Sequence, residues 1–94
     1  MPNAQYEREN LRKTVVGYLA NRCQLRFSAE RIMQNIQHRE MLDYTVSIDD
    51  VTAALKVAEG FGLVTAIPDQ MGATIYYQAT AKGVVESERN GWLS

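Results

Sequence analysis

The chain has 94 residues, 46% of them hydrophobic. The composition suits a soluble globular chain, and the length allows one hydrophobic core but not two. No apolar run approaches the ~20 residues that cross a membrane, and the N-terminal MPNAQYEREN lacks the apolar centre of a secretory signal. A lone cysteine excludes an internal disulfide. We therefore expect one cytoplasmic domain over residues 1–94. The net charge is −1, but residues 1–47 carry seven basic and five acidic side chains, whereas residues 48–94 carry three and six.

The first predicted element is a helix that begins after Asn3, a residue type that caps helix N-termini. Leu11, Val15 and Leu19 recur every four residues, which is the spacing of one helix face. The pattern extends over about five turns to Cys23. We therefore expect Cys23 to be a small core residue of this helix.

A second helix is predicted after a short connection at residues 24–27. Ser28 can cap it, and Ile32, Met33 and Ile36 lie on one face. The helix ends somewhere within residues 37–41, and a loop or short extended piece follows before residue 47.

The third predicted helix has the clearest boundaries. Ser47 followed by Asp50 three positions later is a variant of the capping box. Gly60 and Gly62 end the helix, because glycine reaches the left-handed conformation of a C-cap at little cost. The inward face is Ile48, Val51, Leu55 and Ala58, and the outward face is Asp49, Thr52, Ala53 and Lys56.

A β-hairpin is predicted next. Residues 63–67 indicate a strand, residues 68–72 a turn of five residues, and residues 73–79 the returning strand. Alternation places Ile75 and Tyr77 on one face of the hairpin. We expect the hairpin to add a second layer to the core through Leu63, Ile67, Ile75 and Tyr77.

The last predicted element is a helix capped by Thr80 that runs through Val84 and Glu88. Gly91 then releases a tail at residues 90–94, which contains Trp92. The structured part therefore covers about residues 5–89.

This order of elements resembles a winged helix-turn-helix domain, in which three helices precede a wing. The segment VTAALKVAEGFGLV at residues 51–64 resembles the recognition helix and its exit into the wing. The segment IYYQATAKG at residues 75–83 resembles the second wing strand and the T-x-K-G start of the next helix in MarR-like and PadR-like regulators. The resemblance implies a mainly α fold with a three-helix core, a two-stranded wing and a C-terminal helix. The size and the hairpin are also similar to those of small winged-helix proteins of Mu-like prophages.

The resemblance further implies a transcriptional regulator that binds double-stranded DNA. In such domains the N-terminal half of the third helix enters the major groove, and the wing touches a phosphate or the minor groove. The matching positions are Ser47, Thr52, Ala53 and Lys56 on the helix, Arg26 before the second helix, and Gln70 and Thr74 on the wing.

Acidic residues at the start of the third helix oppose this function. Asp49 and Asp50 would face phosphates, and we interpret them as stabilising the positive end of the helix dipole rather than as contacts to cytosine amino groups. The acidic second half of the chain favours an alternative: a winged-helix module that binds a protein, for example in a phage assembly.

Two aromatic residues are candidate partner-binding anchors, because aromatic side chains are enriched at interface hot spots. They are Tyr76 on the outer face of the wing and Trp92 in the tail. The alternative is that Tyr76 is an isolated surface residue and that Trp92 folds back against the first helix. A homodimer is expected for a regulator, since one contact set of ~3 to 4 base pairs gives little specificity.

No arrangement of residues predicts catalysis. Cys23 and His38 are the only thiol and imidazole, whereas a structural zinc site takes four ligands. Residues 60–62 contain two glycines but follow a helix, so they are not a phosphate-binding loop. We therefore expect no metal, no cofactor and no enzymatic activity.

Overall fold

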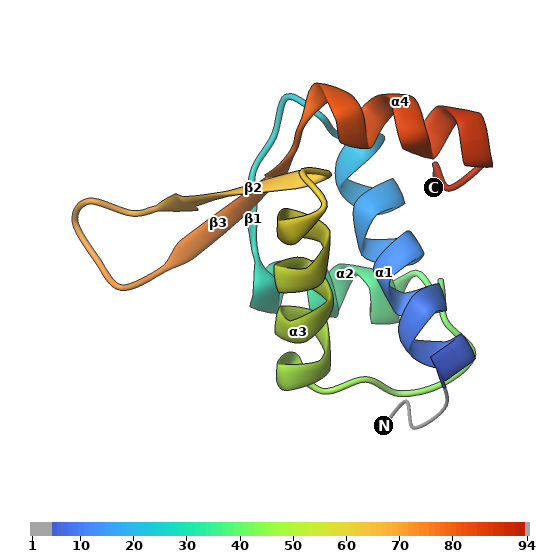
Figure 1. Ribbon diagram of the computed structural model, residues 1–94. Helices are drawn as coiled ribbons and strands as arrows, with labels where there is room; N and C mark the ends of the chain where they lie inside the picture. Colours follow the sequence, from blue (N-terminus) through green and yellow to red (C-terminus); the bar gives the residue numbers. More distant parts are fainter. Residues whose placement is uncertain (1–4, 94) are drawn as a thin grey trace.

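The structure, a computed structural model, describes residues 5–93 and contains four helices and a small antiparallel sheet (Figure 1). Asn3, the predicted cap of the first helix, lies outside the described residues. None of the helices within residues 5–93 has the length and apolar character needed to cross a lipid bilayer. The elements in chain order are α1 (Gln5–Ala20), β1 (Phe27–Ser28), α2 (Ala29–His38), α3 (Ile48–Gly60), β2 (Val64–Pro68), β3 (Ile75–Ala79) and α4 (Ala81–Asn90).

Helix α1 is the central helix of the core, and Leu11, Val15 and Leu19 are buried as predicted. It ends at Ala20, about one turn earlier than expected. The chain turns at residues 21–24, where the amides of residues 22 and 25 each donate to the carbonyl three positions back, at 3.0 and 2.8 Å. Cys23 lies in this turn and is exposed, so the prediction that it is a core residue of the helix was wrong.

Helices α2 and α3 begin at the predicted caps. The Ser28 hydroxyl accepts a hydrogen bond from the amide of Arg31. At α3 the capping box is complete: the Asp50 amide donates to the Ser47 hydroxyl at 3.2 Å, and the Ser47 amide donates to the Asp50 carboxylate at 3.0 Å. Gly62, with φ of 76°, takes the left-handed conformation that lets the chain leave α3 for the wing.

The wing has three strands in the order β1-β3-β2 rather than two. Strand β1 is the segment that we expected to be a connection, and Phe27 pairs there with Tyr77 across an antiparallel ladder. Two residues are too few to produce a visible alternation in the sequence. The hairpin loop is residues 69–74 rather than 68–72, since Pro68 pairs with Ile75 at the outer end of the β2–β3 ladder.

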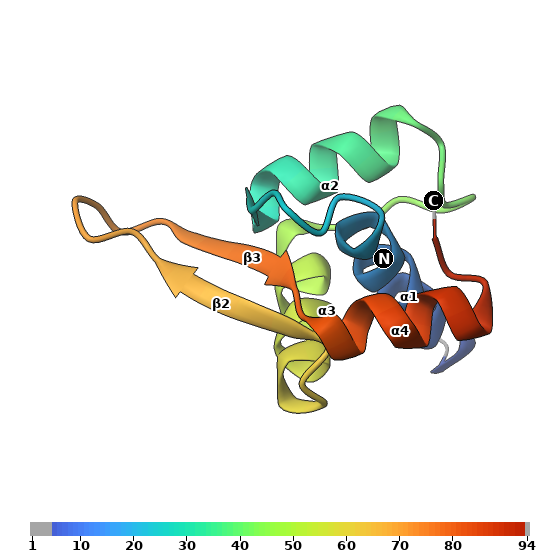
Figure 2. The same ribbon diagram turned by 90° about the horizontal axis from the view of Figure 1, so that it is seen from above.

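Only the base of the hairpin reaches the core. Val64 and Tyr77 are 2% and 4% exposed, whereas Ile75 is 46% exposed, so the prediction that Ile75 is a core residue was wrong. Both views show the hairpin projecting away from the helices, so its outer half has no helix to cover it (Figures 1 and 2). Leu63 packs against the core as expected, and Ile67 is half-buried.

Helix α4 lies across α1, as Figure 2 shows from above. The Thr80 hydroxyl caps it by accepting a hydrogen bond from the Gly83 amide at 3.0 Å, and Gly91, with φ of 72°, ends it. The Trp92 amide then donates to the Ser87 carbonyl at 2.8 Å and directs the tail back toward α1. This helix matches the prediction at both ends.

Candidate nucleic-acid interface

Helices α2 and α3 form a helix-turn-helix pair with a long connection. Ile32 and Ile36 of α2 are fully buried in the shared core. In the connection, Val46 is 4% exposed and its carbonyl accepts a hydrogen bond from the Gln37 side chain at 3.0 Å. These contacts fix the direction in which α3 leaves the turn, and therefore which of its residues face solvent.

The four predicted contact residues of α3 lie on its outer side. Ser47, Ala53 and Lys56 are exposed, and Thr52 is half-buried. The Thr52 hydroxyl donates to the Ile48 carbonyl at 2.8 Å, so its hydrogen is used within the helix. Thr52 therefore presents a methyl group and acceptor lone pairs to a partner.

A groove of about 420 Å³ separates α3 from the wing. Thr52 from α3 and Thr74 from the wing loop both line it, together with Glu30 at the start of α2. Tyr77 lies at its base; burial raises the pKa of the Tyr77 phenol, and the charge of Glu59 raises it further, so this phenol stays neutral at physiological pH. The structure thus brings Thr52 and Thr74 together.

Asp69 is the only charged residue of the wing loop at residues 69–74, and no lysine or arginine occurs within residues 57–81. The Asp69 carboxylate accepts a hydrogen bond from the Met71 amide at 3.1 Å and is thereby turned into the loop. Gln70 is exposed, and Met71, which the sequence analysis did not single out, is 94% exposed. The only sequence signal for the exposure of Met71 is its place beside a glycine in a predicted turn.

Arg26 lies over the outer face of the wing. Its guanidinium carbon is 5.5 Å from the centre of the Tyr76 ring, within the range of a cation–π contact. Tyr76 is half-buried and pairs with Ser28 and Ile67 on the neighbouring strands. Because β1 pairs with β3, Arg26 and Tyr76 meet although they are far apart in the sequence. Arg26, predicted to contact DNA, and Tyr76, predicted to anchor a protein partner, therefore share one surface.

The acidic residues at the start of α3 have different roles. Asp50 is half-buried and completes the capping box with Ser47, as the interpretation of a helix-stabilising aspartate requires. Asp49 is exposed and takes no part in that capping box. Asp49 is therefore the carboxylate that a phosphate backbone would meet.

The tail folds back, which is the second of the two alternatives for Trp92. Its side chain is half-buried and packs against the core, next to Val16 of α1. Cys23 and His38 are both exposed, and within residues 5–93 no three potential metal ligands lie close enough together to hold an ion. Binding of a partner by Trp92 or Tyr76 remains a prediction.

No protein-family model matches the sequence, and no curated protein matches it significantly. Solved structures do match the fold. A transcriptional regulator from Clostridium thermocellum matches 97% of this chain and 85% of its own, with a TM-score of 0.76 and 14% identity. A PadR family transcription regulator from Clostridium difficile gives a TM-score of 0.65 and 18% identity, with 87% of this chain and 85% of its own covered.

A mutant of ZitR from Lactococcus lactis in apo form gives a TM-score of 0.67 and 15% identity over 92% of this chain. The match covers 58% of ZitR, so this chain spans little more than half of that protein. At identities this low the likeness shows the fold alone, and the chain has the winged-helix fold.

Proposed function

We propose that this winged-helix chain binds double-stranded DNA and acts in the cytoplasm as a transcriptional regulator without enzymatic activity. One observation carries the proposal: the outer side of α3 is left uncovered beside a projecting wing, with a groove between them. Two of the similar structures are named as transcriptional regulators, which supports the proposal by analogy.

The proposed contacts follow from the geometry of B-DNA. Its major groove is about 12 Å wide and admits one α-helix. With α3 in that groove, the Ala53 methyl and the Thr52 methyl suit the methyl group of thymine, and the Thr52 acceptor suits an amino group of adenine or cytosine. Gln70 and Thr74 on the wing then reach the adjacent backbone or minor groove.

Phosphate contacts come from few cations. Lys56 is exposed on α3 and Arg26 lies over the outer face of the wing, whereas the wing loop supplies no cation. Each neutralised phosphate adds about 0.9 to the salt dependence of binding, so we expect a shallow salt slope and weak nonspecific affinity.

A binding titration tests the proposal. Lys56→Ala and Arg26→Ala should each weaken binding of a labelled duplex and lower the salt slope by about one unit, measured by fluorescence anisotropy from ~50 mM salt upward. Asp49→Asn should tighten binding several-fold at low salt, because it removes a charge that repels phosphate. Asp50 is left unchanged, since its carboxylate caps α3.

The matched control is Glu40→Gln, which removes the same charge from an exposed position between α2 and α3 that does not line the groove beside the wing. It should change affinity much less than Asp49→Asn, because salt screens charges beyond about 10 Å. Absence of wild-type binding at ~50 mM salt would contradict the proposal and favour the protein-interaction module.

We propose a homodimer as the DNA-binding form, with α4 in the interface. Val85 on α4 is 51% exposed and Leu93 in the tail is 42% exposed, and these two apolar side chains support the proposal. Val85→Glu should shift a dimer toward monomer in sedimentation at micromolar concentration. Val85 is a cleaner site than Trp92, which is half-buried within its own subunit. A monomeric wild type at high concentration would contradict the dimer.

A further inference from the structure

The tip of the hairpin between β2 and β3 carries an exposed apolar surface. Met71 is 94% exposed, the highest value among the exposed large hydrophobic residues of the range 5–93, and Ile75 is 46% exposed. Pro68, which pairs with Ile75 at the outer end of the ladder, is exposed as well. This end of the hairpin projects beyond the helices in both views (Figures 1 and 2). Apolar surface that is held away from the core without cover is typical of a site that meets a partner.

Hydrogen bonds of Asp69 hold the loop that displays Met71. The Asp69 amide donates to the Thr74 carbonyl at 2.9 Å and closes the loop at its base. The Asp69 carboxylate accepts from the Met71 amide at 3.1 Å, and the Asp69 carbonyl accepts from the Gly72 amide at 3.4 Å. Met71 is thus presented by a turn whose backbone is fixed, which lowers the entropy lost when its side chain is buried against a partner.

The charge of the tip decides which part of a duplex it suits. The wing loop has no cation, and its one charged group, the Asp69 carboxylate, would repel phosphate. Methionine is instead one of the apolar residues that minor-groove proteins insert as wedges between base steps. The tip therefore suits the apolar space between two stacked bases better than it suits the DNA backbone.

The tip is continuous with the surface proposed to bind DNA. Ala73, Thr74 and Ile75, which follow Met71 closely along the hairpin, line the groove of about 420 Å³ beside α3. Thr52 of α3 lines the same groove. A duplex that holds α3 in its major groove therefore passes along the wing, and its neighbouring minor groove meets the wing tip.

We propose that Met71 is a wedge that inserts between two base pairs from the minor groove and kinks the duplex toward the major groove, in which α3 lies. The inference rests on the proposed DNA binding. Insertion replaces the stacking of two bases by contact with the thioether side chain, and the bend brings more DNA against the protein. Pyrimidine–purine steps such as TA are the most easily unstacked, so the wedge selects such a step without a hydrogen bond to a base.

A mismatched duplex tests the insertion. The probe is a duplex of about 20 base pairs with a central T·T mismatch, compared with the fully paired duplex of the same length. The wild type should bind the mismatched duplex about tenfold more tightly, because unstacking costs least at a mismatch. Energy transfer between dyes at the two duplex ends should rise on binding, since a kink shortens the distance between the ends.

Two substitutions of Met71 distinguish a wedge from a backbone contact. Met71→Ala should lose both the preference for the mismatch and the rise in energy transfer, while it still binds the paired duplex through α3. Met71→Lys should bind the paired duplex more tightly and raise the salt slope by about one unit, because it adds a phosphate contact. It should nevertheless show neither the preference nor the bend.

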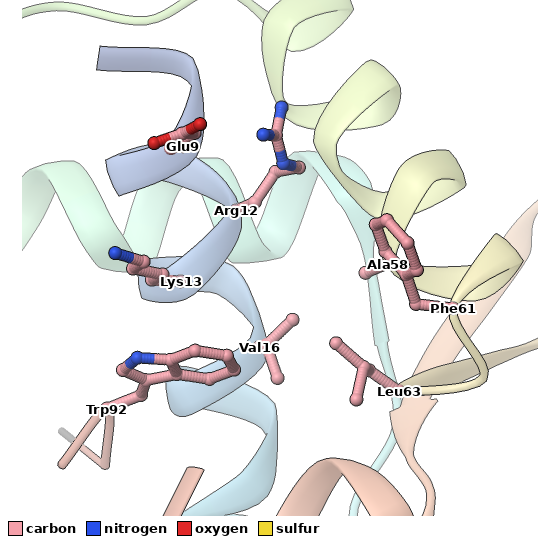
Figure 3. A pocket seen from close by; sticks show the side chains of 8 residues that line it. All are labelled: Glu9, Arg12, Lys13, Val16, Ala58, Phe61, Leu63 and Trp92. Atoms are coloured by element: carbon pink, nitrogen blue, oxygen red, sulfur yellow. The ribbon is translucent and has the colours of Figure 1, made fainter. Parts of the chain in front are cut away.

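The matched control is Phe61→Ala, which also removes a large exposed apolar side chain. Phe61 is 62% exposed and stands opposite Trp92 across a pocket of about 240 Å³ between α1, the end of α3 and the C-terminal tail (Figure 3). This pocket shares no lining residue with the groove beside the wing. Phe61→Ala should therefore keep the mismatch preference and the bend of the wild type.

Three results would overturn the wedge alone: equal affinity of the wild type for the two duplexes, a Met71→Ala variant that keeps the preference and the bend, or a Met71→Lys variant that bends DNA as the wild type does. Each of them leaves the proposed regulator intact, because the paired duplex is still bound. A wild type that binds neither duplex at ~50 mM salt would contradict both proposals.

Discussion

Replacing Leu55 by alanine is expected to lower the free energy of unfolding by about 2–5 kcal/mol. Leu55 is completely buried on the inner face of α3, which packs against α1. The substitution removes apolar contacts and leaves a cavity, because neighbouring helices relax only partly. Urea denaturation followed by circular dichroism measures the change as a shift of the midpoint at constant slope.

Val57→Ala is the matched control for Leu55→Ala. Val57 lies on the same helix but is 40% exposed, so its truncation should change stability by only about 0.5 kcal/mol. If Leu55→Ala and Val57→Ala had equal effects, α3 would not bury the face that the structure assigns to the core, and the orientation of the side proposed to bind DNA would be wrong as well.

Gly83→Ala is expected to lower stability by about 3 kcal/mol, at the upper end of the range for overpacking. A Cβ atom at Gly83 would lie 2.0 Å from the backbone oxygen of Leu63, where no side chain can move aside. Relief of this clash requires α4 to shift. That shift would weaken the hydrogen bond from the Thr80 amide to the same Leu63 oxygen, now 3.1 Å long. Thermal and urea unfolding both report the loss.

The control for this substitution is Gly60→Ala. Gly60 is also helical, does not have positive φ, and has nothing within 4 Å of an added Cβ. Both substitutions reduce the conformational entropy of the unfolded chain equally, so Gly60→Ala should stabilise the protein by about 0.4–1 kcal/mol. A Gly83→Ala variant as stable as Gly60→Ala would mean that α4 does not cross the start of the wing at this distance.

The sequence alone determined the order of the elements and most helix boundaries. Ser28, Ser47 and Thr80 each cap a helix as predicted, and Gly62 and Gly91 take left-handed conformations at helix ends. These features are local. An N-terminal cap needs a hydroxyl and an amide three residues later, and the C-terminal ends seen here need a glycine that tolerates positive φ. Together with the resemblance of residues 51–64 and 75–83 to segments of winged-helix regulators, this order of elements identified the fold.

Tertiary structure decided what is exposed and what meets. Strand β1 exists because the edge of β3 was free to pair with it, and Ile75 is exposed because the hairpin extends beyond the helices; neither fact has a local sequence pattern. The Arg26–Tyr76 contact and the pocket between Trp92 and Phe61 join segments distant in the chain. Such sites depend on how the whole chain closes, whereas helix periodicity reports only which side of each element is apolar.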